Sequence, residues 1–494
     1  MEHSYFIQMK KNNNLQFLYI LLPALYTFIL GATVGLDFSS LGIILLYLIT
    51  VLLFTTFFVF SVSNLLSGLT MICYFSIVFL ACFLPIIGLF LSPYGEHSLS
   101  NIKTLVSMRP VVVSGLFIVL IIKISPLLTR KQWILLSLGF VSLFCSFLIG
   151  NISLVKRFSY LLNSFVPLFI GLTLLAVCLK QVEKSSKTLV SFRTKKYVYF
   201  SFVIACICLL YGYSIELNYD IFRPDLASSY RAEHKGLISY GDYPASWKDK
   251  VSSLKTIRYA GTFFDPIQFG YFCSFASFFC LSHRKREVKI LGIFFLFSLY
   301  LSGSKGAIGF FIMSLFLTIW RRYIGYLFWQ VAFCLSGFFI FISTILSTSG
   351  KIHFAGLIGG VFSIISSPIK NMVFGYGIGA GGNLSIDKNN SLSSNVSWLE
   401  SGAESGFGVL IYQTGFFGVI SFLLLLFYVF YSINTSRVLS GRSKSSLLAI
   451  LISYFTCFLL QENLVNTSIM LMMFLVFTMF LEKKNEKCDF YVRS

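Results

Sequence analysis

The chain has 494 residues, of which 56% are hydrophobic and 12% are charged. A soluble domain carries about a quarter charged residues, so this composition excludes an ordinary water-soluble globular protein. The formal net charge of +20 would suit either a nucleic-acid-binding protein or a membrane protein with basic cytoplasmic loops. The positions of the charges separate these two classes.

Membrane-spanning helices need about 20 predominantly apolar residues. By that rule the sequence predicts crossings at 15–36, 41–60, 69–92, 106–124, 133–155, 158–179, 197–214, 263–282, 324–345, 407–432, 445–461 and 464–481. Two shorter apolar runs, 290–302 and 306–320, meet at Gly303–Ser304–Lys305 and are typical of a hairpin with its tip near one membrane face. We therefore expect an all-α polytopic membrane protein with about 14 transmembrane helices, forming a single integral membrane domain over residues 1–494.

The charged residues divide unevenly between the two sides of this expected topology. One side receives 24 basic and six acidic residues, and the other receives 15 basic and 13 acidic residues. Because cytoplasmic loops carry the excess of Lys and Arg, we assign the basic side and both termini to the cytoplasm. The first apolar run leads directly into another crossing, which favours an uncleaved helix over a signal peptide. The basic excess is therefore topological, and nothing in it supports nucleic-acid binding.

Two connections on the outward side are long, one over 215–262 and the other over 346–406. Loops of that length are usually functional or disordered, and the aromatic and apolar stretches in both favour a functional role. The second loop predicts a helix lying at the membrane interface. The apolar residues that would share one face of this helix are Leu357, Ile358, Val361, Phe362, Ile364 and Ile365.

Cationic side chains on the outward side indicate an anionic substrate. Arg258 stands shortly before Asp265–Pro266, which are typical of a helix N-cap and first-turn residue, and its planar guanidinium suits phosphate oxygens. Arg231 lies in the same loop, where a solvated set of self-paired charges is the better interpretation for most residues. Lys305 at the hairpin tip would cost free energy near the hydrocarbon edge unless paired or used, although a snorkelling lysine would also explain it.

Two further features of the sequence could carry chemistry. Glu404 stands just before the long helix at 407, where a carboxylate could act as a base or stabilise the helix dipole. Asp265 could be a helix cap or a catalytic residue. The stretch 374–382 offers backbone donors for an anion, but a plain turn is the stronger interpretation because no dinucleotide fingerprint is present.

The sequence gives little support to a cofactor or to a transporter. No His pair has metal-ligand spacing and no Cys pair forms a CxxC site, so neither a metal nor a cofactor is expected. The crossings contain almost no ionisable residue, Glu462 at a helix end being the nearest. This argues against a proton-coupled transporter, whose relays need such groups.

Four short motifs, in order across about residues 210–430, resemble those of the bacterial O-antigen polymerase and ligase superfamily. Arg258…Gly261…Phe263-Phe264-Asp265-Pro266 resembles the R-x-x-G-x-F-x-D/N-P element. Leu301-Ser302-Gly303-Ser304-Lys305-Gly306 resembles the T-x-S-R-G element, with Lys305 in place of Arg. Phe374–Gly377 resembles the F-G-x-G stretch, and Glu404-Ser405-Gly406 with Gly415–Gly418 resembles the E/D-S…G-x-x-G helix start.

This resemblance implies a metal-independent, GT-C-like glycosyltransferase of the bacterial inner membrane with two large periplasmic loops. Its substrate would be an undecaprenyl-diphosphate-linked oligosaccharide, and a chain-length regulator would be a further partner. A polymerase of this family transfers the growing glycan to the non-reducing end of a lipid-linked repeat unit. By the resemblance, Arg258, Lys305 and Arg231 would bind the diphosphate, and Glu404 or Asp265 would deprotonate the acceptor hydroxyl.

The alternatives are a ligase of the same superfamily and a flippase or exporter of lipid-linked oligosaccharide. Ligases usually carry a His–Asn pair before the last motif, whereas this chain reads Ser394-Asn395-Val396 and then Gly402-Ala403-Glu404, which favours a polymerase. A flippase or exporter would show charged helix interiors and short outward loops, and this sequence shows the opposite.

Overall fold

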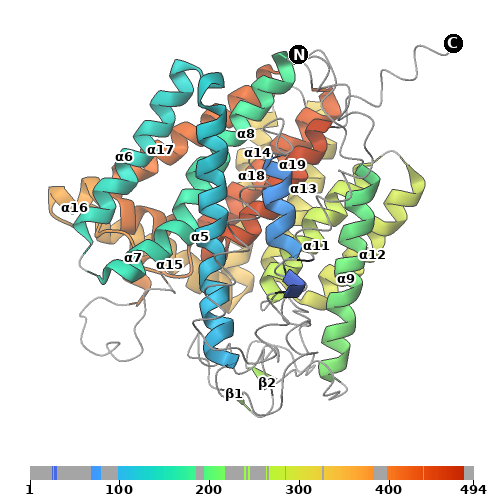
Figure 1. Cartoon of the computed structure of the whole chain (residues 1–494), viewed down its shortest axis with the longest axis horizontal. Coiled ribbons are helices and arrows are strands. Elements are labelled where there is room, and N and C mark those ends of the chain that lie inside the picture. The colour runs from blue at the N-terminus through green and yellow to red at the C-terminus, as the bar shows by residue number, and fades with distance from the viewer. Residues whose placement is uncertain are drawn as a thin grey trace. The chain divides into compact units, whose positions relative to one another are not determined.

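The computed structural model describes residues 25, 27–29, 68–78, 98–150, 152–184, 194–216, 239–240, 243–244, 263, 266–283, 285–324, 328–382, 398–437 and 439–482 (Figure 1). These residues are mostly helical. The strands among them are Ser239–Tyr240 (β1) and Tyr243–Pro244 (β2), which pair antiparallel. The chain forms two compact units, the first comprising residues 1–116, 187–304 and 485–494 and the second residues 117–186 and 305–484.

The first unit contains a tightly packed group of helices. Its labelled helices are α9 (Thr194–Glu216), α11 (Pro266–Leu281) and α12 (Arg286–Ser302), and α5 (Ser98–Ile124) begins in this unit. Helix α11 is buried along most of its length and packs mainly against α12. It begins at Pro266, as the sequence predicts, because proline is well suited to the first turn of a helix.

The second unit contains the helices that follow. They are α6 (Arg130–Ile149), α7 (Leu154–Tyr160), α8 (Val166–Lys184), α13 (Lys305–Ile324), α14 (Phe328–Leu346), α15 (Thr348–Ile365), α16 (Ile369–Phe374), α17 (Gly406–Thr435), α18 (Gly441–Leu460) and α19 (Thr467–Glu482). A π-helical stretch, Leu161–Phe165, joins α7 to α8, and short 3₁₀ turns occupy Ser125–Leu127, Trp398–Ser401 and Glu462–Val465. Helix α17 is the centre of the unit, because it packs against α6, α8, α15, α16 and α18 (Figure 1).

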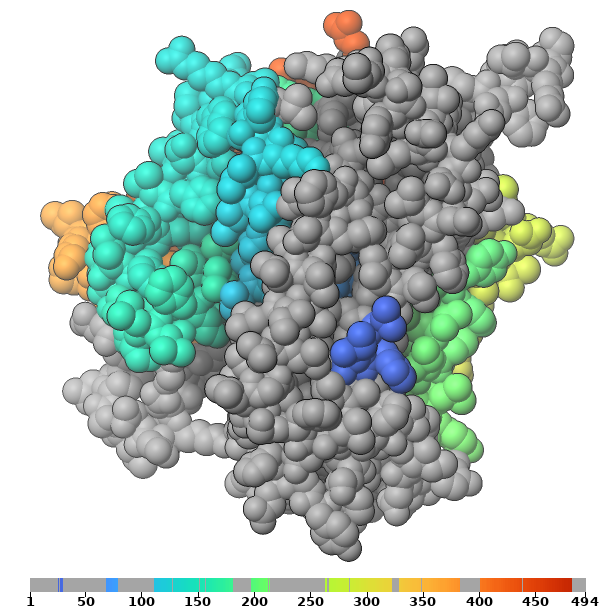
Figure 2. Space-filling model, viewed as in Figure 1, coloured from blue at the N-terminus to red at the C-terminus, as the bar shows by residue number. Residues whose placement is uncertain are grey.

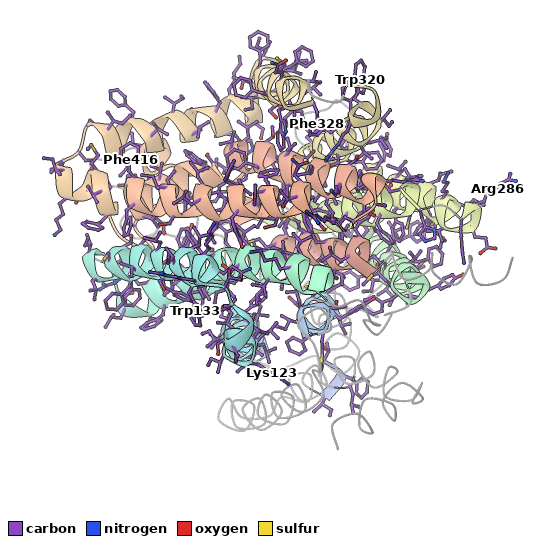
Figure 3. All side chains as sticks on the ribbon, turned by 90° about the horizontal axis from the view of Figure 1, so that it is seen from above. Lys123, Trp133, Arg286, Trp320, Phe328 and Phe416 are labelled. Atoms are coloured by element: carbon purple, nitrogen blue, oxygen red, sulfur yellow. The ribbon has the colours of Figure 1, made fainter. Side chains whose placement is uncertain are left out.

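Five helices among the described residues are long and apolar enough to cross a membrane. They are Arg130–Ile149, Arg157–Lys180, Phe328–Leu346, Gly406–Thr435 and Gly441–Leu460. Helices α6, α14 and α17 expose many large apolar side chains, and those of α6 and α7 form part of the surface seen in Figure 2. Trp133 and Trp320, labelled in Figure 3, are 41% and 43% exposed. Apolar surface of this kind needs lipid around it, so the protein is membrane-embedded.

The predicted crossing 133–155 is wrong at its C-terminal end. Helix α6 stops at Ile149, Gly150 follows in an extended conformation, and α7 begins at Leu154. The side chain of Arg157 fills this corner by donating to the carbonyl oxygens of Phe147 at 2.8 Å and Ile152 at 2.7 Å. Apolar residues continue across the corner, so hydropathy alone does not reveal it.

Helices α13, α17 and α18 meet in a polar cluster at one end of the second unit. Arg321 donates to the carbonyl oxygen of Lys444 at 3.2 Å and to the side chain of Asn434 at 3.4 Å. The ammonium of Lys444 donates to the carbonyl oxygen of Asn434 at 3.0 Å. This end of the unit therefore holds cations that the sequence assigns to the cytoplasm.

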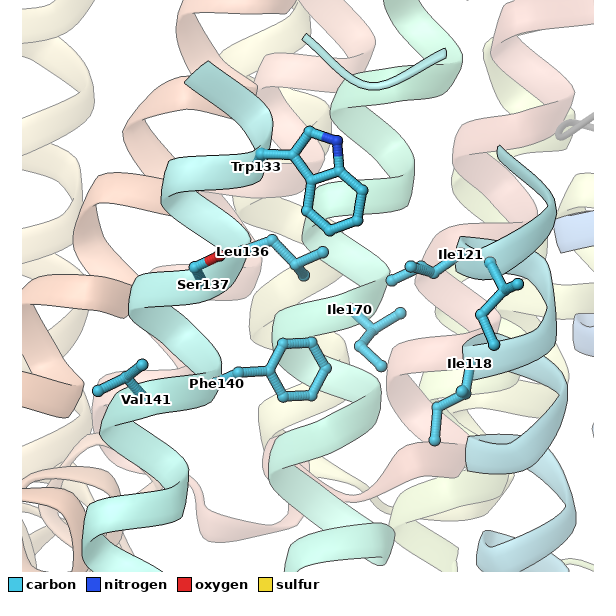
Figure 4. Close-up of a pocket in the computed structure, with 9 residues that line it drawn as sticks. Ile118, Ile121, Trp133, Leu136, Ser137, Phe140, Val141 and Ile170 are labelled. Carbon is cyan, nitrogen blue, oxygen red and sulfur yellow. The ribbon is translucent and has the colours of Figure 1, made fainter. Parts of the chain in front are cut away.

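An apolar groove lies between α5, α6 and α8 in the second unit. Its volume is about 350 Å³, and Trp133, Phe140 and Ile170 are among the side chains that line it (Figure 4). The lining holds none of the predicted site residues. Its composition suits a hydrocarbon chain rather than a sugar or a phosphate, so the groove does not offer the polar groups of the predicted site.

Candidate functional site

Helix α17 is broken at Gly415, whose backbone (φ 62°, ψ −168°) is not helical although helix continues on both sides. At this break the carbonyl groups of Tyr412 and Gln413 accept hydrogen bonds from the N–H groups of Tyr376 at 2.9 Å and Gly377 at 3.1 Å. Irregular backbone within a membrane helix is tolerated only where the protein satisfies its polar groups. The break and the glycine-rich stretch therefore form one structural element.

The glycine-rich stretch is a turn held by α17. Its residues with positive φ are Gly375, Gly377, Gly379 and Gly382, at 76°, 99°, 85° and 87°. The side chain of Gln413 accepts from the N–H of Gly379 at 2.9 Å and donates to the carbonyl oxygen of Gly381 at 2.6 Å. All N–H groups from residue 375 to residue 380 donate to acceptors within the protein. They are not free to bind an anion, and the plain-turn interpretation is confirmed.

Glu404 adopts a strained backbone conformation. Its φ is 70°, and within the described part of the chain it is the sole residue other than glycine with a positive φ. The left-handed conformation costs a residue with a side chain about 1–2 kcal/mol, and such strain clusters at functional sites. The turn is closed by the N–H of Ser405, which donates to the carbonyl oxygen of Gly402 at 3.2 Å. Glu404 thus stands two residues before Gly406, the first residue of α17, close to where the sequence predicts the helix start.

Ser405 ties the start of α17 to the end of α18. Its hydroxyl accepts from the N–H of Gly408 at 2.9 Å and donates to the carbonyl oxygen of Leu459 at 2.7 Å. One side chain therefore satisfies orphan backbone groups at the ends of two helices. A Cβ at Gly406 would lie 2.8 Å from the carbonyl oxygen of Phe458, so this close approach requires glycine.

Glu462 clamps the backbone of Glu404. Its carboxylate lies between α18 and α19 and accepts from the N–H of Glu404 at 3.1 Å and from the hydroxyl of Tyr160 at 3.0 Å. The N–H of Glu462 donates in return to the carbonyl oxygen of Glu404 at 3.1 Å. Glu462 is only 8% exposed, and a buried carboxylate is costly unless it is hydrogen-bonded. These bonds therefore hold residue 404 in its strained conformation.

Lys305 lies at the same end of the second unit. It is the first residue of α13 and its side chain is exposed. A Cβ at Gly306 would overlap the side-chain amide of Gln461, so the start of α13 touches the residue that precedes Glu462. The ammonium of Lys305 lies at the positive end of the α13 dipole, which is unfavourable unless an anion is present. The ammonium and the helix N-terminus together attract an anion. Lys305 and Glu404 thus both stand beside the pair Gln461–Glu462.

His353 of α15 contacts Glu404 directly. Its Nδ1 lies 2.9 Å from the backbone carbonyl oxygen and 3.3 Å from a carboxylate oxygen of Glu404. The sequence argument against a ligase considered only histidines near Glu404 in the chain. His353 is 51 residues upstream but lies beside Glu404 in space, so that argument no longer separates a polymerase from a ligase.

A glycine pair on α15 allows this contact. A Cβ at Gly356 would overlap the carbonyl oxygen of Ala403, and one at Gly360 would lie 2.7 Å from the carbonyl oxygen of Gly408. The spacing Gly356-x-x-x-Gly360 is the small-residue pattern that lets helices in membranes approach closely. The helix predicted from the apolar residues between Leu357 and Ile365 is confirmed, and its glycine face brings it against the Glu404 turn.

Of the five predicted site residues, the structure describes two. Lys305 and Glu404 lie at one end of the second unit, linked through the neighbours Gly306, Gln461 and Glu462. Arg258, Arg231 and Asp265 lie outside the described residues. Sequence reasoning missed Tyr160 and Gln413, which have no distinctive local pattern. It noted Glu462 as a helix-end carboxylate, but assigned neither Glu462 nor His353 to the site.

The arrangement provides the groups that a group-transfer reaction needs. A half-buried carboxylate with an imidazole against it can accept a proton, and an exposed ammonium at a helix start can stabilise negative charge. Among the described residues, no group of three or more His, Cys, Asp or Glu side chains could hold a metal ion. Neither the known protein-family models nor the curated protein sequences contain a match to this chain.

Proposed function

We propose that this protein is a metal-independent membrane glycosyltransferase that polymerises a surface polysaccharide such as O-antigen. It would transfer the growing glycan from undecaprenyl diphosphate to the non-reducing end of a lipid-linked repeat unit. The observation that carries the proposal is Glu404, an acidic residue clamped in a strained conformation at the end of the unit where Lys305 is exposed. The sequence motifs that suggest this chemistry include both residues.

In the proposed reaction, the acceptor hydroxyl attacks the anomeric carbon of the donor sugar. A new glycosidic bond forms there, the bond from that carbon to the diphosphate oxygen breaks, and the hydroxyl proton passes to the carboxylate of Glu404. Asp265 is the alternative base. The leaving diphosphate gains negative charge, which preorganised cations stabilise. Lys305 and Arg258 would supply these cations, with Arg231 as a third.

The proposed membrane arrangement is GT-C-like, with about 14 crossings in the bacterial inner membrane, both termini in the cytoplasm and loops 215–262 and 346–406 in the periplasm. The distribution of charged residues between the two ends of the second unit supports this arrangement. Arg321 and Lys444 meet at one end of α18, while Glu404 and Lys305 stand beside the other end. The positive-inside rule assigns the first end to the cytoplasm, which leaves the site facing the periplasm.

The test is a complementation experiment read on a polysaccharide gel. Cells lacking the gene are supplied with the wild type, Glu404→Gln, Asp265→Asn, Lys305→Ala or Arg258→Ala. We expect the wild type to restore a ladder and Glu404→Gln, Lys305→Ala and Arg258→Ala to leave only single repeats. Removing one preorganised donor typically lowers a rate by about 10²–10³-fold. A normal ladder with Glu404→Gln and loss of the ladder with Asp265→Asn would move the base to Asp265.

Two control variants make this test specific. Lys351→Ala removes another exposed lysine from the second outward loop and should leave the ladder intact. Lys305→Arg keeps the cation, as in the related motif, and should retain polymerisation. If Lys351→Ala abolished the ladder as Lys305→Ala does, the effect would be one of general surface charge and the assigned role of Lys305 would be wrong.

A ligase of the same superfamily is the second candidate, and the contact between His353 and Glu404 favours it. The gel separates the two functions, because loss of a ligase removes all surface glycan, including single repeats. Purified protein with lipid-linked repeats as the sole substrate would separate them again, since only a polymerase lengthens that glycan. If neither glycan change followed gene deletion, both functions would be refuted.

A further inference from the structure

His353 holds a defined position against Glu404. It lies on α15 and is 17% exposed, while the side chain of Glu404 is 26% exposed. One ring nitrogen, Nδ1, faces both the backbone carbonyl oxygen and a carboxylate oxygen of Glu404. The other, Nε2, lies 3.1 Å from the hydroxyl of Ser349, one helical turn earlier on α15.

These neighbours determine which ring nitrogen carries the proton. A carbonyl oxygen can only accept a hydrogen bond, so Nδ1 must be the donor at 2.9 Å. In a neutral imidazole Nε2 is then an acceptor, and the hydroxyl of Ser349 donates to it. His353 is thus expected as the Nδ1–H tautomer, which donates to the backbone carbonyl oxygen of Glu404 and lies 3.3 Å from the carboxylate of the same residue.

We infer that His353 is a positioning residue of the candidate site, which orients the carboxylate of Glu404 through Nδ1–H while Glu462 holds the backbone. The inference rests on the proposed function for the role of Glu404. Both partners contact the backbone carbonyl oxygen of Glu404. Glu462 also holds the backbone N–H, whereas His353 also lies 3.3 Å from the carboxylate. A base that is held in one orientation needs no reorganisation before it accepts a proton.

The tautomer can be measured without any assay of function. The chain has five histidines, so selective ¹⁵N-histidine labelling gives a simple spectrum of the full-length protein in detergent. At about pH 8.5 an ordinary imidazole is neutral, and its two nitrogens differ strongly in ¹⁵N shift. We expect the signals that disappear in His353→Asn to be those of an Nδ1–H tautomer.

His283 provides an internal control of the opposite kind. Its Nδ1 accepts a hydrogen bond from the N–H of Lys285 at 3.2 Å, so its expected tautomer is Nε2–H. Glu404→Ala should change the ¹⁵N shifts of His353 and leave those of His283 unchanged. An Nε2–H tautomer at His353, or no response to Glu404→Ala, would overturn the inference whether or not the protein polymerises glycan.

The functional role is tested by variants that separate positioning from proton transfer. His353→Ala removes the donor, and a misplaced catalytic group can cost on the order of 10²-fold in rate. We expect kcat for polymerisation to fall by about 10–100-fold with little change in KM. His353→Asn retains an N–H near the position of Nδ1 but cannot act as a base, and it should recover most of the lost rate.

Three outcomes decide the inference. Recovery in His353→Asn supports positioning, whereas His353→Asn as inactive as His353→Ala would mean that His353 itself transfers the proton. An unchanged rate in His353→Ala would remove His353 from the site. If the wild type lengthened no glycan at all, the proposed function would fail, and the ¹⁵N measurement would still decide whether His353 orients Glu404.

Discussion

The strain at Glu404 predicts that glycine at this position gives a more stable protein than alanine, which is the reverse of the order at an ordinary position. Glu404→Gly and Glu404→Ala both remove the carboxylate and its contact with His353, so they differ only in what the backbone must do. At most positions glycine is less stable than alanine by about 0.4–1 kcal/mol, because it loses more freedom on folding. At φ 70° the alanine variant retains a cost of about 1–2 kcal/mol that glycine does not have.

Subtracting the entropic cost of glycine from the strain cost of alanine leaves the glycine variant more stable by about 1 kcal/mol. Equilibrium unfolding in mixed detergent–SDS micelles would measure it, with both variants compared in one titration series. Under the proposed function both should be equally unable to polymerise glycan, since neither has a carboxylate at this position. An alanine variant as stable as the glycine variant would refute the claim that residue 404 is strained.

Other contacts in the second unit give matched predictions. Gly415→Ala should destabilise the protein by about 2 kcal/mol or more, the upper part of the range for strained positions. Gly337→Ala is the control, because its added Cβ has nothing within 4 Å, and it should be neutral or stabilising. Equal effects of the two variants in unfolding titrations would contradict the break in α17. Tyr160→Phe removes one donor from the buried carboxylate of Glu462 and should cost about 1–3 kcal/mol in the same titration, and no loss would show that water replaces the hydroxyl. Ser405→Ala should cost about 0.5–2 kcal/mol through the lost N-cap, measured the same way, and a stability equal to the wild type would mean that the cap is dispensable.

The parts of the fold that follow from local chemistry are predictable from the sequence. Pro266 starts a helix, Gly303 ends one with φ 58°, and the apolar pattern between residues 357 and 365 forms a helix. In each case residues close in the chain determine the conformation. Helix ends are harder, as the corner after Gly150 illustrates, because both sides of it are equally apolar.

The composition of the site is less predictable, because its contacts join distant parts of the chain. Tyr160 and Glu462 are 302 residues apart, and nothing near either residue indicates the other. The glycine-rich stretch illustrates the converse problem. Its composition allows both an anion site and a turn. The sequence does not show that its N–H groups bond within the protein, two of them to the carbonyl groups at the break in α17. The spacing of Gly356 and Gly360 is a local pattern in the sequence that indicates a close contact of α15 with another segment.

The contact between Tyr160 and Glu462 has a consequence for biosynthesis. The chain is made and inserted from its N-terminus, so the partners of Glu404 emerge at very different times. Tyr160 and His353 precede Glu404, but Glu462 is made near the end of the described chain, between the last two helices. Until that segment is inserted, the backbone of Glu404 has no clamp. A nascent chain anchored in the membrane would therefore hold Glu404 in its strained conformation only after the segment that carries Glu462 has been inserted.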